Sequence, residues 1–244
     1  MPRTVLDEGL QNLRSQMLQV AREVEHALLT TLTALKTGEH QMLPPIIAHD
    51  FSIDRMCAVT EQQALRLLIL QQPLGGPDLR FLTAALFIND HFASMGDTVV
   101  QIAETLLQAA SLHHRTVQAP SYSIEGSAVD QQGLLTEVFI LRGLLLLGKE
   151  IQSIFSTTIE AFTLQDVVKA RTIENERSFV ERRYTPICQD IQQMQASLAG
   201  ISSQQRDAFL LQRLTSLLWI AHKLAEMATS IAAICKRIIF IVEG

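Results

Sequence analysis

The sequence is short of the residues that mark nucleic-acid-binding proteins. Only 18% of its 244 residues are charged, and 25 Asp and Glu residues outnumber 20 Lys and Arg residues, which gives a net charge of -5. Binding to nucleic-acid phosphates needs clustered cations, and no basic stripe occurs along the chain. We therefore expect no nucleic-acid partner.

Cysteine is also scarce and no export signal is evident. Cys57, Cys188 and Cys235 are widely separated and form neither a CxxC pair nor an even disulfide set. The opening MPRTVLDEGLQNLRSQ is polar and charged and lacks the apolar core of a signal peptide. The most apolar segment, 208–242, is interrupted by charges, which is typical of an amphipathic buried helix. These features predict a cytoplasmic protein that reaches the membrane only through partners.

Glycine and proline are few, 11 and 7 residues, and they cluster between long segments whose apolar residues recur at intervals of three and four. This spacing predicts helices over about 7–36, from Met42 or Pro45 to about 71, and over about 77–114. With 48% hydrophobic residues, the chain can bury a large core. An all-α protein follows.

The helical pattern occurs twice. Residues 116–132 lose the apolar period and gather Pro, Ser and Gly, which predicts a linker. One constant shift relates the first two predicted helices to the chain after the linker, and a slightly longer shift relates the third. The first shift pairs Val24 with Ile151, Leu28 with Phe155, Ile53 with Val180 and Asp54 with Glu181, and the second pairs Asp78 with Asp207 and Asp97 with Glu226. We predict two tandem three-helix repeats, 1–115 and 133–244, packed side by side as six long antiparallel helices.

One stretch of the third predicted helix carries an unexpected Gly-Asp pair. At about 100° per residue, Phe92, Met95, Val99 and Ile102 share one stripe, and Asp97 falls on the opposite stripe. Asp97 is therefore either solvated or part of a site formed by several helices.

Several segments carry a resemblance to a known family. The stretch LLILQQPLGGPDLRFLTAALFINDHFASMGDTVVQIAE resembles the signature of PhoU regulators, a Gln-Pro turn, an Asp-Leu-Arg helix start and a Leu-Glu-Arg-Ile-Gly-Asp helix. The opening VLDEGLQNLRSQMLQVAREVEHALLTTLTAL, HDFSID at 49–54 and the closing IIFIVEG are similar at corresponding places. The resemblance covers nearly the whole chain, including its two repeats.

The resemblance implies a negative regulator of phosphate uptake and of the phosphate-starvation response. Such a protein links the ATPase of a phosphate ABC transporter to a phosphate-sensing histidine kinase, needs no catalysis and no cofactor, and is a homodimer. The helix start at Asp78 and Arg80 is a predicted docking point, although Arg80 could equally pair with an acid of its own chain. The alternatives are a metal-binding helical bundle, enzymatic or for storage, and a diverged scaffold that serves another transporter.

The family also carries a carboxylate motif proposed to hold metal, and this sequence keeps only part of it. Ala93 replaces the signature Glu, which leaves one set of Asp50, Asp54 and Asp97. The second set would be Glu181, His222 and Glu226, where Arg177 and Lys223 replace other motif positions. Because it contains a histidine, the second set is the better match to Fe, Zn or Ni, although the two nearby cations would repel a metal ion.

The remaining motifs point to structure rather than catalysis. Glu23 and His26 form an ExxH pair, but di-iron bundles need two such pairs and two further Glu residues. The sequence has no phosphate-binding GxxxxGKS loop and no GxSxG elbow. We predict a non-enzymatic protein.

Overall fold

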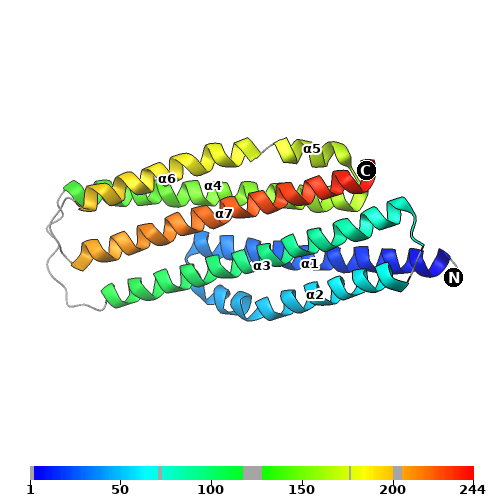
Figure 1. Cartoon of the computed structure of the whole chain (residues 1–244). Coiled ribbons are helices and arrows are strands. Elements are labelled where there is room, and N and C mark those ends of the chain that lie inside the picture. Colours follow the sequence, from blue (N-terminus) through cyan, green and yellow to red (C-terminus); the bar gives the residue numbers. More distant parts are fainter. Residues whose placement is uncertain (1–2, 71–72, 118–127, 176, 200–204) are drawn as a thin grey trace.

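The structure, a computed structural model, describes residues 3–70, 73–117, 128–175, 177–199 and 205–244 (Figure 1). Throughout this part the ordered elements are helices, and strands are absent. The elements are α1 (Arg3–Thr37), the short 3-10 helix η1 (His40–Met42), α2 (Leu43–Leu70), α3 (Gly76–Val117), α4 (Ala128–Leu164), α5 (Val167–Asn175), α6 (Arg177–Ala199) and α7 (Gln205–Glu243). The all-α prediction is confirmed.

The helix ends reproduce the shifts found in the sequence. The end of α4 follows the end of α1 by the same interval that separates Ile151 from Val24. The start of α7 follows the start of α3 by the longer interval that separates Asp207 from Asp78. The residues that follow α1 and α4 both have positive φ, 75° at Gly38 and 53° at Gln165. The same backbone turn therefore ends the first helix of each repeat, and α5 and α6 together take the place that α2 has in the first.

The linker predicted over 116–132 is too long. Residues 116 and 117 belong to α3, and residues 128–132 belong to α4. The remainder, 118–127, lies outside the described residues. Polar and small residues interrupt a helix only weakly when they extend an existing one, because each added residue gains a backbone hydrogen bond. The predicted linker was therefore too long at both ends.

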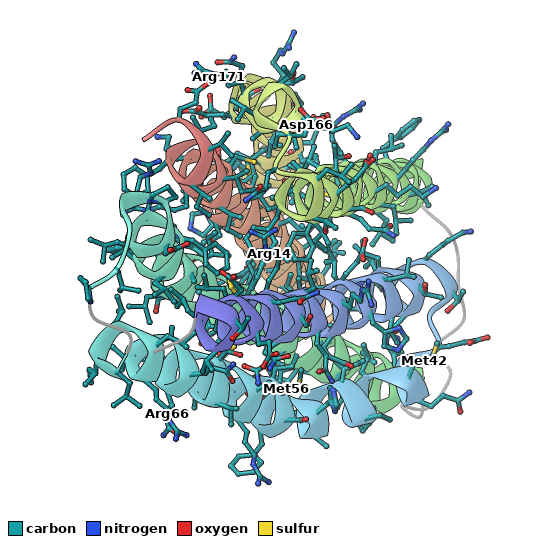
Figure 2. All side chains as sticks on the ribbon, turned by 90° about the vertical axis from the view of Figure 1, so that its right-hand side faces the viewer. Arg14, Met42, Met56, Arg66, Asp166 and Arg171 are labelled. Atoms are coloured by element: carbon teal, nitrogen blue, oxygen red, sulfur yellow. The ribbon has the colours of Figure 1, made fainter. Side chains whose placement is uncertain are left out.

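Contacts between helices divide the bundle into a centre and two flanks, and Figure 2 shows α2 on one flank in a view along the bundle. The centre consists of α1 and α3 from the first repeat and α4 and α7 from the second, with α1 against α4 and α3 against α7. Helix α2 packs on α1 and α3, and α5 and α6 pack on α4 and α7. The two repeats are therefore joined through four helices and leave α2 and α6 on opposite outer sides.

The core follows the three-and-four spacing of the sequence. On α3 the predicted stripe of Phe92, Met95, Val99 and Ile102 is buried, with exposed fractions of at most 2%. Phe92 meets Phe155 of α4 edge to face, with ring centroids 6.1 Å apart. One continuous apolar cluster therefore extends through both repeats.

The long helices remain amphipathic. Among the described residues, no helix combines the length and the hydropathy that crossing a membrane requires.

Candidate functional site

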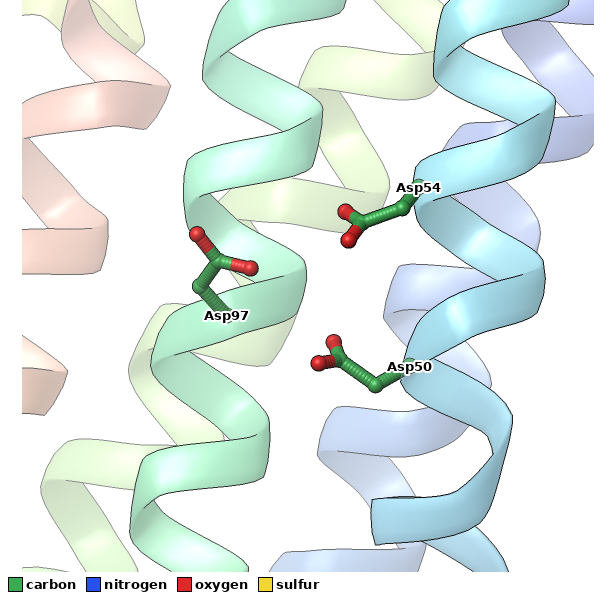
Figure 3. Close-up of side chains that lie close together, drawn as sticks. All are labelled: Asp50, Asp54 and Asp97. Carbon is green, nitrogen blue, oxygen red and sulfur yellow. The ribbon is translucent and has the colours of Figure 1, made fainter.

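Three carboxylates meet between α2 and α3. Asp50 and Asp54 are four residues apart, so they lie on the same face of α2, and both point toward Asp97 of α3 (Figure 3). One carboxylate oxygen from each residue lies within 4.8 Å of the others. Asp54 and Asp97 are exposed and Asp50 is half-buried, so the cluster opens to the surface.

Gly96 explains how the two helices come close enough for this. A Cβ atom added at Gly96 would lie 3.2 Å from Cγ2 of Ile53, a side chain buried between α2 and α3. A glycine therefore permits a close helix approach next to the carboxylates. The Gly-Asp pair thus has two functions: Gly96 packs against α2, and Asp97 faces the carboxylates of α2.

The carboxylates destabilise one another when they are charged. Burial raises the pKa of Asp50, and the charges of Asp54, Asp97 and Glu104 raise it further. Burial also raises the pKa of Asp97, with a smaller contribution from Asp54. In addition, Oδ1 of Asp50 is buried and has no hydrogen-bond partner within the described structure. A cation at this place would relieve both the repulsion and the unpaired oxygen.

The donor set suits a hard divalent cation. Three carboxylates supply up to six oxygen atoms, which is the chemistry that Mg²⁺, Ca²⁺ and Mn²⁺ prefer, whereas sites for Fe²⁺, Zn²⁺ and Ni²⁺ more often include imidazole or thiolate. Ala93 stands where the PhoU signature described above has Glu, so α3 supplies only Asp97 to the cluster. Water would complete the coordination of any bound ion.

The second predicted set is not assembled in the same way. Glu181, His222 and Glu226 do not form a group of neighbouring ligand atoms in the part of the chain that the structure describes. Nδ1 of His222 lies 3.2 Å from the hydroxyl of Tyr184, and Lys223 donates to Glu226 at 2.7 Å. The geometry thus favours the first set, although the sequence favoured the second.

Sequence reasoning missed several neighbours of these residues. Tyr184 belongs to no motif, yet it contacts His222. The ammonium of Lys223 lies 4.6 Å from the ring centre of Trp219, so this lysine both packs on an aromatic ring and pairs with an acid. Tyr184 lies on α6 and His222 on α7. A helical wheel could place them near each other only once the alignment of the two helices is known, so the sequence alone gives no signal for this contact.

The ExxH pair does not act as a unit. Glu23 pairs with Nε2 of His49 on α2 at 3.2 Å, and His26 is exposed. The three cysteines are free. Burial raises the pKa of Cys57 to about 12 and that of Cys235 to about 11, which opposes thiolate formation and nucleophilic chemistry.

The predicted docking residues lie at the start of α3. Asp78 is in the first turn of the helix, where a carboxylate meets free backbone amides. Leu79 is exposed. Arg80 is half-buried beside the C-terminal residue, since a Cβ added at Gly244 would lie 3.1 Å from Nη1 of Arg80. The segment therefore joins one end of α3 to the end of α7.

Comparison with known proteins supports the resemblance seen in the sequence. The family model described as "PhoU domain" matches residues 17–106. The chain is 20% identical to the phosphate-specific transport system accessory protein PhoU homolog of Clostridium acetobutylicum, covering all of this chain and 97% of the other. It is 25% identical to the corresponding Streptococcus pneumoniae homolog, serotype 4, with coverage of 99% and 97%.

Solved structures share the fold over nearly the whole length. The crystal structure of the phosphate transport system regulatory protein PhoU from Streptococcus pneumoniae aligns with a TM-score of 0.75 at 22% identity, covering 98% of this chain and 97% of that one. PhoU from Pseudomonas aeruginosa aligns with a TM-score of 0.77 at 18% identity, with coverage of 98% and 99%. The arrangement of helices is thus common to proteins of low sequence identity.

Proposed function

Because the chain belongs to the PhoU family, we propose that it is an accessory protein of a phosphate-specific transport system and a negative regulator of phosphate uptake. The observation that carries this proposal is end-to-end similarity to relatives named for that system. As an adaptor it would bind the transporter's ATPase and the phosphate-sensing histidine kinase at the inner face of the membrane. No catalysis is part of this role.

The exposed start of α3 is the proposed contact with one of these partners. It presents an exposed apolar side chain, Leu79, between the half-buried Asp78 and Arg80. At protein interfaces an apolar side chain commonly contributes affinity by leaving water, while neighbouring charges of opposite sign orient the partner. We expect this segment to contribute to affinity without any change in the fold.

Binding of the purified chain to the ATPase and to the kinase, measured by interferometry, tests the adaptor role. A Kd in the micromolar range, about -8 kcal/mol, is expected for at least one partner. Arg80→Glu should weaken that binding at least tenfold, while Arg22→Glu, the same charge change at an exposed position of α1, should not. No binding to either partner contradicts the adaptor role, and equal binding by both variants contradicts only the contact at α3.

A second proposed role is cation binding at the α2–α3 carboxylates, favoured by their converging oxygens and the unpaired Oδ1 of Asp50. Calorimetric titration with Mg²⁺, Ca²⁺, Mn²⁺, Fe²⁺, Zn²⁺ and Ni²⁺ separates the two predicted sets. Asp54→Asn should abolish binding, and His222→Ala with Glu226→Ala should leave it intact. The opposite pattern would assign the metal to the second set, and no heat with any ion would rule out both.

A further inference from the structure

Arg14 of α1 is a half-buried arginine without an acidic partner in the part of the chain that the structure describes. Figure 2, a view onto one end of the bundle, places it between α1 and the ends of α4 and α7. Its guanidinium carbon lies 5.0 Å from the ring centre of Phe81, and among the described residues no hydrogen bond or ion pair joins its charged group. No residue three or four positions away on α1 is acidic.

The acids at this end of the bundle have other partners. Asp166 accepts a hydrogen bond of 3.0 Å from the backbone N–H of Lys169, and Glu243 binds Arg171. Burial lowers the pKa of Arg14, and no acid of the described chain raises it again. The guanidinium is therefore partly withdrawn from water without a counter-ion, which costs free energy.

Arg14 separates a dry apolar space from an open hollow. On its inner side Phe81, Phe162 and the end of α7 pack too tightly to admit a water molecule. On its outer side a hollow of about 290 Å³ is lined by Leu10, Gln11 and Arg14. A water molecule takes up about 30 Å³ of the liquid, so the hollow has room for a small ion together with several waters.

The second repeat shows that the fold does not need a charge at this place. The shift that relates Val24 to Ile151 places Arg14 on Leu141, and the longer shift places Phe81 on Leu210. Both leucines are partly buried and pack against the core. An apolar pair thus fills the related place, so packing alone does not explain an arginine in the first repeat.

The donors of Arg14 remain available to a ligand in the outer hollow. The ring of Phe81 attracts the positive charge but takes up none of the N–H donors in conventional hydrogen bonds. These donors form a rigid fork that matches two oxygen atoms of a phosphate or a carboxylate group. Gln11 precedes Arg14 by three residues, so it lies on the same face of α1, where its side-chain amide provides a further donor.

We propose that the hollow at Arg14 binds a small oxyanion, a phosphate or a carboxylate group, held by the guanidinium of Arg14 and the amide of Gln11. The oxyanion supplies the counter-ion that the described chain lacks there. The site is separate from the carboxylate cluster and from the contact at the start of α3, and its failure would leave the adaptor role untouched.

Calorimetric titration of the full chain with inorganic phosphate and with acetate, in a buffer free of other oxyanions, tests the site. One-to-one binding of at least one probe is expected, and the probe that binds identifies the group. Arg14→Leu should weaken that binding at least tenfold with an unchanged helical circular dichroism spectrum, because leucines fill the related place of the second repeat.

The matched control is Arg237→Leu, which removes another half-buried arginine whose guanidinium lies over an aromatic ring, that of Phe87 at 4.0 Å. This variant should bind the oxyanion as the wild type does. Absence of binding with both probes overturns the proposal. So does equal binding by Arg14→Leu, or equal weakening by Arg14→Leu and Arg237→Leu.

Gln11→Glu is a second test, because it supplies the counter-ion from within the chain. A Glu three residues before Arg14 lies within reach of its guanidinium. The variant should weaken oxyanion binding at least tenfold and should have a higher unfolding temperature than the wild type when no oxyanion is present. Gln189→Glu makes the same change at an exposed position of α6 with no cation three or four residues away, and it should alter neither property. Undiminished binding by Gln11→Glu would overturn the site.

Discussion

At the scale of single residues, the carboxylate cluster lowers the stability of the folded protein when its members are charged. Asp50 and Asp97 have raised pKa values because of burial first and neighbouring charge second. Between the unfolded and the folded pKa, the folded chain binds more protons than the unfolded one. The free energy of unfolding therefore falls as pH rises through that interval, and at neutral pH the charged cluster is destabilising.

Asp50→Asn should raise the stability of the metal-free protein at pH 7, because it removes one charge and its repulsion with Asp54 and Asp97. The gain should vanish below the unfolded pKa of Asp50, where the native carboxyl is neutral in both states. Urea unfolding between pH 3 and pH 7 measures this. Asp190→Asn, at an exposed position of α6, is the control and should change little. A loss of stability in Asp50→Asn at pH 7 would contradict the repulsion argument.

The two left-handed turn residues offer a matched pair. Gln165 has φ 53°, a conformation that a residue with a Cβ atom adopts at a cost, whereas the related Gly38 adopts it freely. Gln165→Gly should raise the free energy of unfolding by about 0.5 to 1 kcal/mol, the difference between relieved strain and greater freedom of the unfolded chain. Thermal and urea unfolding measure it.

Gly38→Ala should have the opposite sign and lower stability by about 1 kcal/mol. A Cβ added at Gly38 meets nothing within 4 Å, so the backbone conformation alone determines the effect. If both substitutions destabilise equally, the turn after α4 is not the strained counterpart of the turn after α1.

At the scale of elements, the start of α5 depends on one side chain. Oδ1 of Asp166 accepts a hydrogen bond of 3.0 Å from the backbone N–H of Lys169, which caps the helix. Asp166→Ala should therefore cost about 1 kcal/mol. Glu39 is the related residue of the first repeat and makes no capping bond from its side chain. Glu39→Ala should leave stability unchanged, and equal losses in the two variants would contradict the assignment.

Helix type and order were predictable from the sequence, whereas helix ends were less so. The spacing of apolar residues located the first three helices, but α1 begins at Arg3 rather than near 7, and α3 extends to Val117 rather than to 114. The missed ends contain apolar residues, such as Leu6 and Val117, but each end is too short to show an apolar period, and its backbone can continue an existing helix at little cost. The repeats were inferred from positions such as Val24 and Ile151, which recur at a fixed shift and are both buried.

At the scale of the whole molecule, the sequence indicated which residues face a core but not which helices share it. Asp50, Asp54 and Asp97 were grouped through the family motif, and the structure brings them together because α2 packs on α3. Glu181, His222 and Glu226 were grouped by the same reasoning, but Tyr184 and Lys223 occupy two of them. Which side chains reach these residues depends on how the helices are aligned along one another, and a single sequence does not specify that alignment.

The shared core predicts that the two repeats unfold together. Phe92 of the first repeat and Phe155 of the second meet edge to face inside the four central helices, and both are buried. Phe155→Ala should therefore lower the free energy of unfolding by about 3 to 5 kcal/mol, and a double-mutant cycle with Phe92→Ala should show a coupling of about 0.5 to 1.5 kcal/mol. Urea unfolding followed by circular dichroism measures both.

The single tryptophan makes cooperativity visible. Trp219 lies on α7, so its fluorescence reports the second repeat, whereas circular dichroism reports all helices. Coincident transitions from the two probes are expected, in the wild type and in Phe155→Ala, because α1, α3, α4 and α7 bury their apolar faces against one another. Separate transitions would mean that each three-helix repeat is stable without the other, and the aromatic contact would then be a junction between two folding units rather than the centre of one.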